Sequence, residues 1–400
     1  MQSNQSISHL LTIGPLPPPP SGANISFQVF CAEAVGANRL SHLEIIDSSP
    51  KRIKQNTSIM TFRNLSQAGR VIRQFASKIK RADAALIFGS NQFLASLTPI
   101  LVLIARLSGK PCYIRSFGGS VDQFSQQANG LLRWLLLTGF RLSNGLIVET
   151  QLLYSYFKEI PGIKVHYIPA YRTMPKDEAS VPASLTNRDG ETRKPLRLVF
   201  VSWVRAEKGV TVLLEALRHL APEEQAEIHC DIYGPILEQY RPQFESELER
   251  TSCAHYGGAL EPELVVPTLQ NYDALVFPTF WQSEGQPGIV VESMIAGIPA
   301  IASNYRSVPE VITHQVNGLL VEPGNAFDLA DAIRTVLHNR QLLPEMGRRN
   351  WEMRSQYDTD TVIAQLLRIL KVDALVAADS PTAIQAAAQV VEPLKPKVAK

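Results

Sequence analysis

Residues 196–203 read LRLVFVSW, a nearly continuous apolar run, and residues 211–220 read TVLLEALRHL, with apolar residues three and four positions apart. The first pattern is typical of a buried strand and the second of an amphipathic helix. The alternation continues toward the C-terminus, with a helical pattern at Ala326–Leu337 and strand-like runs at Glu227–Tyr233, Tyr272–Pro278, Pro299–Ala302 and Gly318–Val321. Short apolar strands that alternate with helices predict βαβ units and a parallel sheet covered on both faces.

The N-terminal half repeats this pattern less clearly. Its predicted strands are Leu10–Gly14, His42–Asp47, Ala84–Phe88, Pro111–Arg115, Leu146–Val148 and Val165–Ile168. Between the halves, a stretch rich in Pro, Ser, Asn and Asp has no periodicity, which is typical of a linker. The sequence therefore predicts an α/β fold of two Rossmann-like, doubly wound domains, with their mutual cleft as the default ligand site. We expect domains at 1–175 and 196–350, a linker at 176–195, a helix within 351–375 and a disordered tail at 376–400.

Composition excludes several classes of protein. The chain has 400 residues, of which 45% are hydrophobic and 19% charged, so it can bury a sizeable core of two or three domains. A net charge of +2 does not provide the excess of positive charge that binding to a nucleic-acid backbone requires. We therefore expect no nucleic-acid partner. The four cysteines lack CxxC spacing, which disfavours a disulfide scaffold and a thiolate metal site: they are Cys31, Cys112, Cys230 and Cys253.

No segment has the pattern of a secretory signal or a membrane span. The first 20 residues carry no positive charge ahead of their short apolar stretch. The longest apolar runs, Phe93–Leu107 and Leu131–Phe140, fall short of the ~18–20 residues that cross a bilayer. We therefore expect a cytoplasmic protein.

The most informative motif is Phe277–Glu292, FPTFWQSEGQPGIVVE. It predicts a strand end, a loop of small residues and a helix that begins near Gly288. Free N–H groups in the first helical turn form an anion site that suits a diphosphate. Glu284 could accept hydrogen bonds from sugar hydroxyls and Glu292 could reach a ribose. For the acidic pair alone, the alternative is that the glycines only form a turn and both glutamates are solvated.

The residues after this motif favour the binding interpretation. Glu284 and Glu292 are separated by seven residues and are succeeded by SMIAGIPAIAS at 293–303 and VPEVITHQVNGLLVEPGNAFDLADAI at 308–333. This run closely resembles the C-terminal domain of the retaining GT-B glycosyltransferases of family 4, the glycosyl transferases group 1. The signature of that family is E-x7-E, a small-residue stretch and a PEVI…NGLLV…P segment. The resemblance implies a GT-B fold, in which the C-terminal helix returns toward the N-terminal domain.

Shorter matches extend the resemblance upstream. Glu207-Lys208-Gly209 is similar to the family's phosphate-contacting Lys-Gly turn, Ile232–Pro235 to its strand-Gly turn, and His255–Gly258 to the segment near the nucleotide base. In the N-terminal half, Ile13–Leu16 followed by a proline run and Gly22 resembles the family's first strand and glycine-containing loop. The proline run also fits a stiff polyproline II spacer.

Two positions depart from the family pattern. Many members carry a histidine before glycine where this chain has Phe117. Many also carry Gly-Arg or Ser-Arg at the end of the strand that here ends in Ser202-Trp203, and that Arg clamps the donor diphosphate together with the Lys. Arg205, two residues later, could replace it, Lys208 could act alone, or the site could be weakened.

The resemblance implies transfer of a sugar from a nucleotide-sugar donor to an acceptor hydroxyl with retention, in polysaccharide or glycoconjugate biosynthesis. The implied enzyme is hexosyltransferase-like and metal-independent, and it needs no cofactor. The implied catalytic residues are Glu284, Lys208 and Arg205. The implied donor-binding residues are Gly22, Gln286, Pro287, Gly288, Ile289 and Glu292. The chemistry requires positive charge because the leaving group is a nucleoside diphosphate. No general base is identifiable, which fits a family thought to use the leaving phosphate for that purpose.

Several alternatives stay open. A nucleotide-sugar-binding protein without turnover is permitted by Trp203, and a GT-B epimerase or phosphorylase is a further reading. Asp358-Thr359-Asp360 has metal-binding spacing, but a helix N-cap explains it better, and the eight histidines give no zinc pattern. The implied acceptor is a saccharide or a lipid-linked saccharide. Leu131–Phe140 could lie on the inner membrane face near such an acceptor, although we favour a buried helix.

Overall fold

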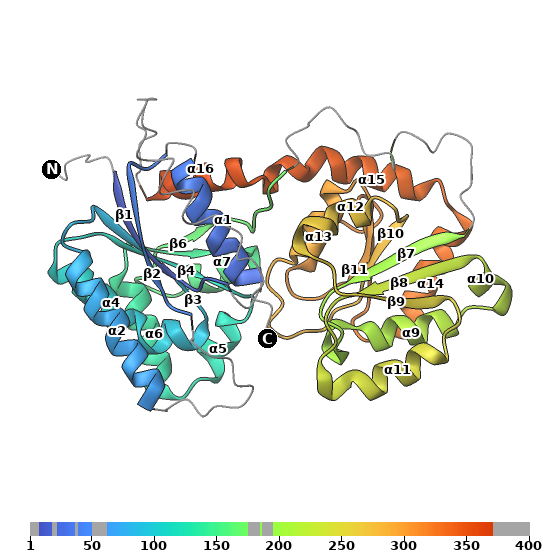
Figure 1. Ribbon diagram of the computed structural model, residues 1–400, viewed down its shortest axis with the longest axis horizontal. Helices are drawn as coiled ribbons and strands as arrows, with labels where there is room; N and C mark the ends of the chain where they lie inside the picture. The colour runs from blue at the N-terminus through green and yellow to red at the C-terminus, as the bar shows by residue number, and fades with distance from the viewer. Residues whose placement is uncertain are drawn as a thin grey trace, which may run out of the picture. The chain divides into compact units, whose positions relative to one another are not determined.

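The computed structural model describes residues 8–17, 22–36, 39–49, 62–174, 185 and 195–370 (Figure 1). The chain divides into two compact units. Unit 1 comprises Met1–Tyr171 with Thr359–Lys400, and unit 2 comprises Arg172–Asp358. Most of the predicted linker at 176–195 and the whole predicted tail at 376–400 lie outside the described residues.

Unit 2 is built on a parallel sheet whose described strands follow the order β12-β11-β10-β7-β8-β9. The strands are β7 (Leu196–Val201), β8 (Ile228–Tyr233), β9 (Ala254–Gly258), β10 (Ala274–Phe277), β11 (Ala300–Ser303) and β12 (Gly318–Val321). The α-helices are α9 (Val210–Arg218), α10 (Pro222–Ala226), α11 (Arg241–Glu249), α12 (Val265–Leu269), α13 (Gly288–Ile295), α14 (Ala326–His338) and α15 (Leu342–Met353). Short 3₁₀ turns are η1 (Ala206–Lys208), η2 (Glu238–Tyr240), η3 (Pro262–Leu264), η4 (Val308–Glu310) and η5 (Arg354–Tyr357).

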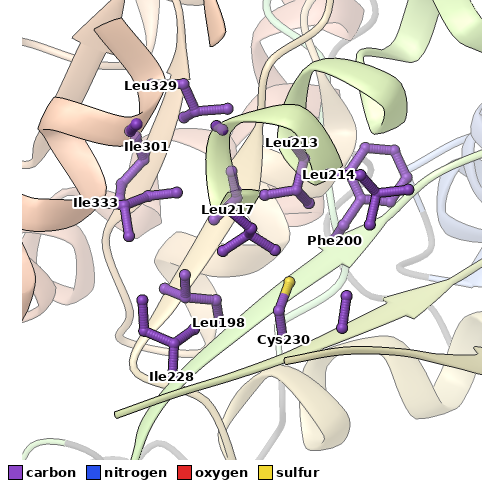
Figure 2. Packing of buried hydrophobic residues seen from close by; sticks show 14 of the residues in the cluster. Leu198, Phe200, Leu213, Leu214, Leu217, Ile228, Cys230, Ile301, Leu329 and Ile333 are labelled. Atoms are coloured by element: carbon purple, nitrogen blue, oxygen red, sulfur yellow. The ribbon is translucent and has the colours of Figure 1, made fainter. Parts of the chain in front are cut away.

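The side chains of β7 alternate between two cores. Leu198 and Phe200 pack with α9, α11 and α14 on one face of the sheet, and Figure 2 shows this cluster around Leu213, Leu217 and Ile333. Val199 packs with α12 and α13 on the other face. A strand buried on both faces needs a continuous apolar run, and this requirement explains the sequence of residues 196–203.

Unit 1 has a second parallel sheet with the described strand order β2-β1-β3-β4-β5-β6. Its strands are β1 (His9–Gly14), β2 (His42–Asp47), β3 (Ala84–Gly89), β4 (Cys112–Ser116), β5 (Gly145–Val148) and β6 (Val165–Tyr167). Its α-helices are α1 (Gly22–Gly36), α2 (Phe62–Lys78), α3 (Asn91–Ser96), α4 (Thr98–Leu107), α5 (Val121–Gln127), α6 (Gly130–Leu142), α7 (Gln151–Lys158) and α16 (Thr359–Ile369).

The helix α16 completes unit 1 although it follows all of unit 2 in the chain. Its buried residues Val362, Leu366 and Leu367 share a core with Phe27 and Phe30 of α1. The helix expected within 351–375 corresponds to α16, and the end of α15 and η5 precede it in the same range.

The predicted α/β class with two doubly wound sheets is confirmed. Strand β9, with the sequence AHYGG, had not been predicted. It lies at the edge of its sheet and three of its five residues are exposed, so it has no apolar run to reveal it.

Candidate functional site

The order of the strands in unit 2 identifies one position as the candidate ligand site. Chain order runs outward from β7 through β8 to β9 on one side, and from β10 through β11 to β12 on the other. The strands β7 and β10 are neighbours, but the chain leads from them toward opposite edges of the sheet. The loops that follow these two strands therefore lie where the direction of winding reverses. Open α/β sheets bind ligands in the crevice outside the carboxyl ends of strands at such a point. The two loops contain Lys208 and Glu284 respectively.

The loop after β7 is packed tightly against the loop after β10. Gly209, directly after η1, has a φ of 83°, and a Cβ added there would overlap the carbonyl oxygen of Pro278. The N–H of Phe280 donates to the carbonyl oxygen of Glu207 at 2.9 Å. Only glycine fits this position, because both its backbone conformation and the approach of the neighbouring chain exclude a side chain.

This packing brings Lys208 to Glu284. Lys208 Nζ lies 2.8 Å from Glu284 Oε2, and the Thr279 hydroxyl donates to the same oxygen at 2.8 Å. Glu284 is 7% exposed and Thr279 is fully buried. A carboxylate at this depth needs a cation and hydrogen-bond donors to offset its desolvation. Two residues that the sequence assigned to the site are therefore in direct contact.

The loop then leads into α13, which begins at Gly288 as predicted. The Ser307 hydroxyl donates to the carbonyl oxygen of Gly285, and the N–H of Val290 donates to that of Pro287 at 3.1 Å. The preceding N–H groups of Gly288 and Ile289 lie in the first helical turn, where no intrahelical acceptor exists. The start of α13 thus presents N–H groups and the positive end of a helix dipole.

Glu292, on the second turn of α13, contacts a residue that the sequence did not point to. Arg172 Nε donates to Glu292 Oε1 at 2.7 Å. A Cβ added at Gly288 would overlap Arg172 Nη2, so the guanidinium lies against the first residue of the helix. Arg172 stands where the chain leaves β6 for the linker, outside any motif or periodic pattern, so no local signal could have identified it.

Arg205 pairs with a neighbouring carboxylate, and its part in a diphosphate clamp stays a prediction. Its guanidinium forms two hydrogen bonds with Glu207, at 2.9 and 3.0 Å, and stacks over the ring of Trp281 at 4.1 Å. The hydrogen bonds from Arg205 hold the pKa of the Glu207 carboxyl below its ordinary value. Trp203 is half exposed and fills the family's Arg position with an apolar ring. The charge of Arg205 is therefore already balanced by its neighbour.

The predicted residues of unit 1 have separate settings. Gly22 is exposed at the start of α1, and its contact with a donor stays a prediction. Phe117, which stands where many relatives have histidine, is buried, and its ring centroid lies 5.3 Å from that of Phe88. Phe117 therefore contributes to packing and supplies no polar contact.

The discounted signals have structural explanations. Asp360 pairs with Arg39 at 2.6 Å, and Asp358 directly precedes the first residue of α16. Within the described ranges no group of three His, Cys, Asp or Glu side chains is placed to hold a metal ion. Among the same residues, no helix combines the length and apolar character that crossing a membrane requires. The four cysteines are buried, and burial raises the pKa of the Cys112 thiol to about 12.

Comparison with known families adds to this geometry. Residues 185–353 match the family described as glycosyl transferases group 1. The matched segment is shorter than half of the chain, and it contains β7, β10, α13 and the contact between Lys208 and Glu284.

Two curated relatives each align with less than half of the chain. The amylovoran biosynthesis glycosyltransferase AmsK of Erwinia amylovora is 25% identical over 185 residues, which make up 44% of this chain and 45% of AmsK. The sulfoquinovosyl transferase of Arabidopsis thaliana is 27% identical over 173 residues, which make up 42% of this chain and 32% of that protein. The alignments span less than half the length of either relative.

Solved structures match over most of the chain. HepE of Anabaena in complex with UDP has a TM-score of 0.68 at 15% identity, covering 90% of this chain and 99% of HepE. Sucrose-phosphate synthase of Thermosynechococcus elongatus has a TM-score of 0.68 at 15% identity, covering 91% and 98%. At such identities the likeness concerns the fold alone, and the predicted GT-B fold is confirmed.

Proposed function

Because residues 185–353 match the glycosyl transferases group 1 family, we propose that the protein transfers a sugar from a nucleotide-sugar donor to an acceptor hydroxyl. The observation that carries this proposal is the contact between Lys208 and Glu284 beside the start of α13. It joins a cation, a buried carboxylate and a helix N-terminus at the point where the sheet reverses its winding. Polysaccharide or glycoconjugate biosynthesis is the proposed setting, as the name of AmsK indicates for that relative.

The leaving group in this reaction is a nucleoside diphosphate, which gains negative charge as the glycosidic bond breaks. Lys208 would balance that charge, and the N–H groups at Gln286–Ile289 would hold the phosphates at the start of α13. These groups supply the electrostatic role that a divalent cation has in other transferases. We therefore propose hexosyl transfer without a bound metal or cofactor.

The two glutamates would recognise the sugars on either side of the diphosphate. Both hydrogen bonds that reach Glu284 from Lys208 and Thr279 use Oε2, which leaves Oε1 to accept from hydroxyls of the donor sugar. Glu292 would accept from the ribose hydroxyls. Retention of the anomeric configuration is proposed from the resemblance, with the leaving phosphate taking the proton of the acceptor hydroxyl.

A thermal-shift panel of UDP-, GDP- and ADP-sugars tests the donor, because a ligand that binds only the folded state raises its melting temperature by mass action. UDP comes first in the panel because HepE was solved with UDP, with UDP and glucose, and with UDP-glucose. We expect one base to give a clear shift. No shift with any nucleotide at millimolar concentration would contradict the proposal.

A binding protein without turnover is the second candidate, and Trp203 at the family's Arg position favours it. Replacement Glu284→Ala separates the two readings. If the wild type transfers sugar and the variant binds donor without transferring it, the protein is an enzyme and the binding-only reading is wrong. An epimerase would convert the donor with no acceptor present, so the same assay without acceptor tests that reading.

We also propose that unit 1 contacts an anionic membrane surface, where a lipid-linked acceptor would lie. The helices α4 and α6 each pack one apolar face against the core of unit 1. Their outer faces carry apolar side chains as well. Exposed on these faces are Ile100, Leu103, Leu107, Leu131 and Trp134. Soluble proteins rarely gather so many large apolar side chains on one exposed surface. The favoured prediction of a buried helix at 131–140 therefore describes only the inner face of α6.

The charges on this surface favour anionic lipid as the partner. Neither α4 nor α6 contains an Asp or Glu, and Arg106, Arg133 and Arg141 are exposed there. Arg106 and Arg141 donate to the backbone carbonyls of Leu142 and Pro161 respectively. Within the described residues, neither forms an ion pair with a carboxylate. Cations interspersed with Trp and Leu are typical of helices that lie in the membrane interface.

Co-sedimentation with vesicles tests the contact. We expect binding to vesicles that contain phosphatidylglycerol, weakening with salt, and little binding to pure phosphatidylcholine. The double replacement Leu107→Ser and Trp134→Ser should release the protein. Leu264→Ser, which removes a half-exposed leucine from unit 2, serves as the control and should bind like the wild type. Self-association through the same face, seen as a dimer that the double replacement abolishes, would overturn the membrane proposal.

A further inference from the structure

Arg172 is held firmly at the edge of the proposed donor site. Its N–H donates to the carbonyl oxygen of Tyr357 at 2.9 Å, and its backbone bridges to Asp358. Its side chain therefore projects from a fixed point. Arg172 Nε reaches Glu292 Oε1 at 2.7 Å, and Nη2 lies against Gly288.

This position brings a guanidinium to the positive end of a helix dipole. A cation beside the first residue of a helix adds to the positive end of the helix dipole, which normally favours negative charge. Glu292 balances one charge, but the helix terminus remains positive. An anion bound there would interact favourably with both the guanidinium and the N–H groups. The arrangement suits a site that is completed by a phosphate group.

Arg205 is less suited to that role. Its guanidinium already meets both carboxylate oxygens of Glu207 and the face of Trp281, and recruiting it would break all of these contacts. Arg172 Nε donates to Glu292, and Nη2 lies against Gly288 at the start of α13. Of the two arginines, Arg172 is the one placed beside the proposed phosphate position.

We propose that Arg172 is the second cation of the donor-diphosphate site, acting with Lys208 in place of the arginine that Trp203 replaces. The inference rests on the proposed function and extends its site by one residue. In this arrangement Lys208 contacts Glu284 in the loop between β10 and α13, and Arg172 lies against Gly288 at the end of that loop. Arg172 would contact the phosphates while keeping the Glu292 carboxylate oriented toward the ribose.

The matched control is another arginine of unit 2. Arg218 pairs with Glu247 at 2.6 Å with side-chain exposures of 23% and 19%, and Arg172 pairs with Glu292 at 2.7 Å with exposures of 23% and 21%. Arg218→Ala therefore removes an ion pair of nearly equal length and burial that does not adjoin the start of α13. It should leave the affinity for nucleotides unchanged.

Calorimetric titration with UDP, GDP, ADP and the corresponding nucleosides tests the assignment. For the diphosphate that the wild type binds, Arg172→Ala should weaken binding about ten- to a hundredfold, as expected for loss of a charged hydrogen-bond donor. Its effect on the nucleoside should be under about twofold, and Arg172→Lys should restore part of the loss. Equal weakening of nucleoside and diphosphate, the pattern expected of Glu292→Gln, would show that Arg172 only positions Glu292 and would overturn the proposal.

Two further measurements separate this inference from the proposed function. Gly288→Ala should displace the guanidinium and weaken diphosphate binding, but it should add little in an Arg172→Ala background, because both changes act on one contact. Inorganic pyrophosphate probes the anion site without any nucleotide-sugar chemistry. If pyrophosphate binding depends on Arg172 while no nucleotide or nucleotide sugar binds, the Arg172 site stands and the proposed function fails. If nucleotide sugars bind and Arg172→Ala binds them as tightly as the wild type, the proposed function stands and the Arg172 inference fails.

Discussion

Lys208 Nζ lies 2.8 Å from Glu284 Oε2, although the two residues are 76 positions apart in the chain. The contact joins the loop after β7 to the loop after β10. Each partner offsets the electrostatic cost of burying the other, because an isolated charge at this depth would be strongly unfavourable. The pair also holds the cation in place before a donor arrives, so that little reorganisation accompanies binding.

Replacement Lys208→Met should abolish most of the activity. The methionine side chain keeps a comparable length but brings no charge to the departing diphosphate. We expect kcat to fall about 10²- to 10³-fold, as for other groups that stabilise developing charge. Steady-state transfer assays with the donor identified by the thermal-shift panel measure the effect.

The control for that replacement is Lys78→Met in unit 1, which removes an ion pair with Glu44 at 3.0 Å and should leave kcat unchanged. A Lys208→Met variant with wild-type kcat and a raised KM would place Lys208 in ground-state binding only.

Arg205→Ala should have a much smaller effect than Lys208→Met. Arg205 already pairs with Glu207, in a partly exposed setting where such pairs contribute little to stability. We expect kcat/KM to fall less than about fivefold, since the guanidinium is already paired with Glu207 and stacked on Trp281. The same transfer assay measures this fall. A loss as large as that of Lys208→Met would mean that Arg205 does contact the donor diphosphate, as the sequence suggested.

Gly209→Ala should destabilise unit 2 and separate the two loops of the site. The added Cβ would overlap the Pro278 carbonyl oxygen at a backbone φ of 83°. We expect a loss of more than about 2 kcal/mol in the free energy of unfolding, measured by urea denaturation, together with lost activity. Gly324→Ala has a similar φ of 74° but open space around the Cβ, so it reports the backbone strain alone. Equal losses in the two variants would show that the contact with Pro278 is unimportant.

Much of the fold was predictable because its determinants are local. The run at 196–203 is apolar on both faces, and a strand between two helical layers requires this. The start of α13 at Gly288 follows from a loop of small residues ahead of an apolar helix. Lys208 and Glu284 were placed in loops by such patterns, but their approach to each other came from the family resemblance.

The features that escaped prediction depend on contacts between distant segments. Arg172 carries no local pattern, and its partner Glu292 is 120 positions away. The return of α16 to unit 1 was implied by the family resemblance, but no local pattern identified its core partners Phe27 and Phe30, more than 300 residues earlier. Periodicity identifies an apolar face but does not say which core receives it. On α6 it also could not show that the second apolar face stays exposed.

Leu366→Ala in α16 should loosen unit 1 selectively. Leu366 is fully buried in the core that α16 shares with α1, and its truncation leaves a cavity. We expect a loss of about 2–5 kcal/mol in local stability. Hydrogen exchange should quicken for the backbone amides of α1 and stay unchanged for α9. Leu264→Ala, at an exposed position, is the control and should alter neither helix, whereas faster exchange in α9 of Leu366→Ala would contradict assignment of α16 to unit 1.

Asp83 should make the start of β1 sensitive to acid. Its Oδ2 accepts hydrogen bonds from the N–H groups of Ser8 and His9, both at 2.9 Å, and from the Ser8 hydroxyl at 3.0 Å. Burial alone would raise the pKa of this carboxyl, but the hydrogen bonds outweigh it and hold the pKa below its ordinary value. A carboxyl with a lowered pKa in the folded state stabilises that state above the unfolded pKa of about 4 and loses this contribution as the pH falls through the lowered value.

Asp83→Asn should therefore cost about 1–2 kcal/mol in the free energy of unfolding at pH 7, because the amide replaces a charged acceptor with a neutral one. The difference from the wild type should shrink as the pH is lowered below about 4, where the wild-type carboxyl also becomes neutral. Urea denaturation of both proteins at pH 7, 5, 4 and 3 measures it. Asp331→Asn, at an exposed position on α14, controls for the loss of a surface carboxylate. A difference for Asp83→Asn that stays constant across this range would mean that the hydrogen bonds act without regard to the charge of the carboxyl.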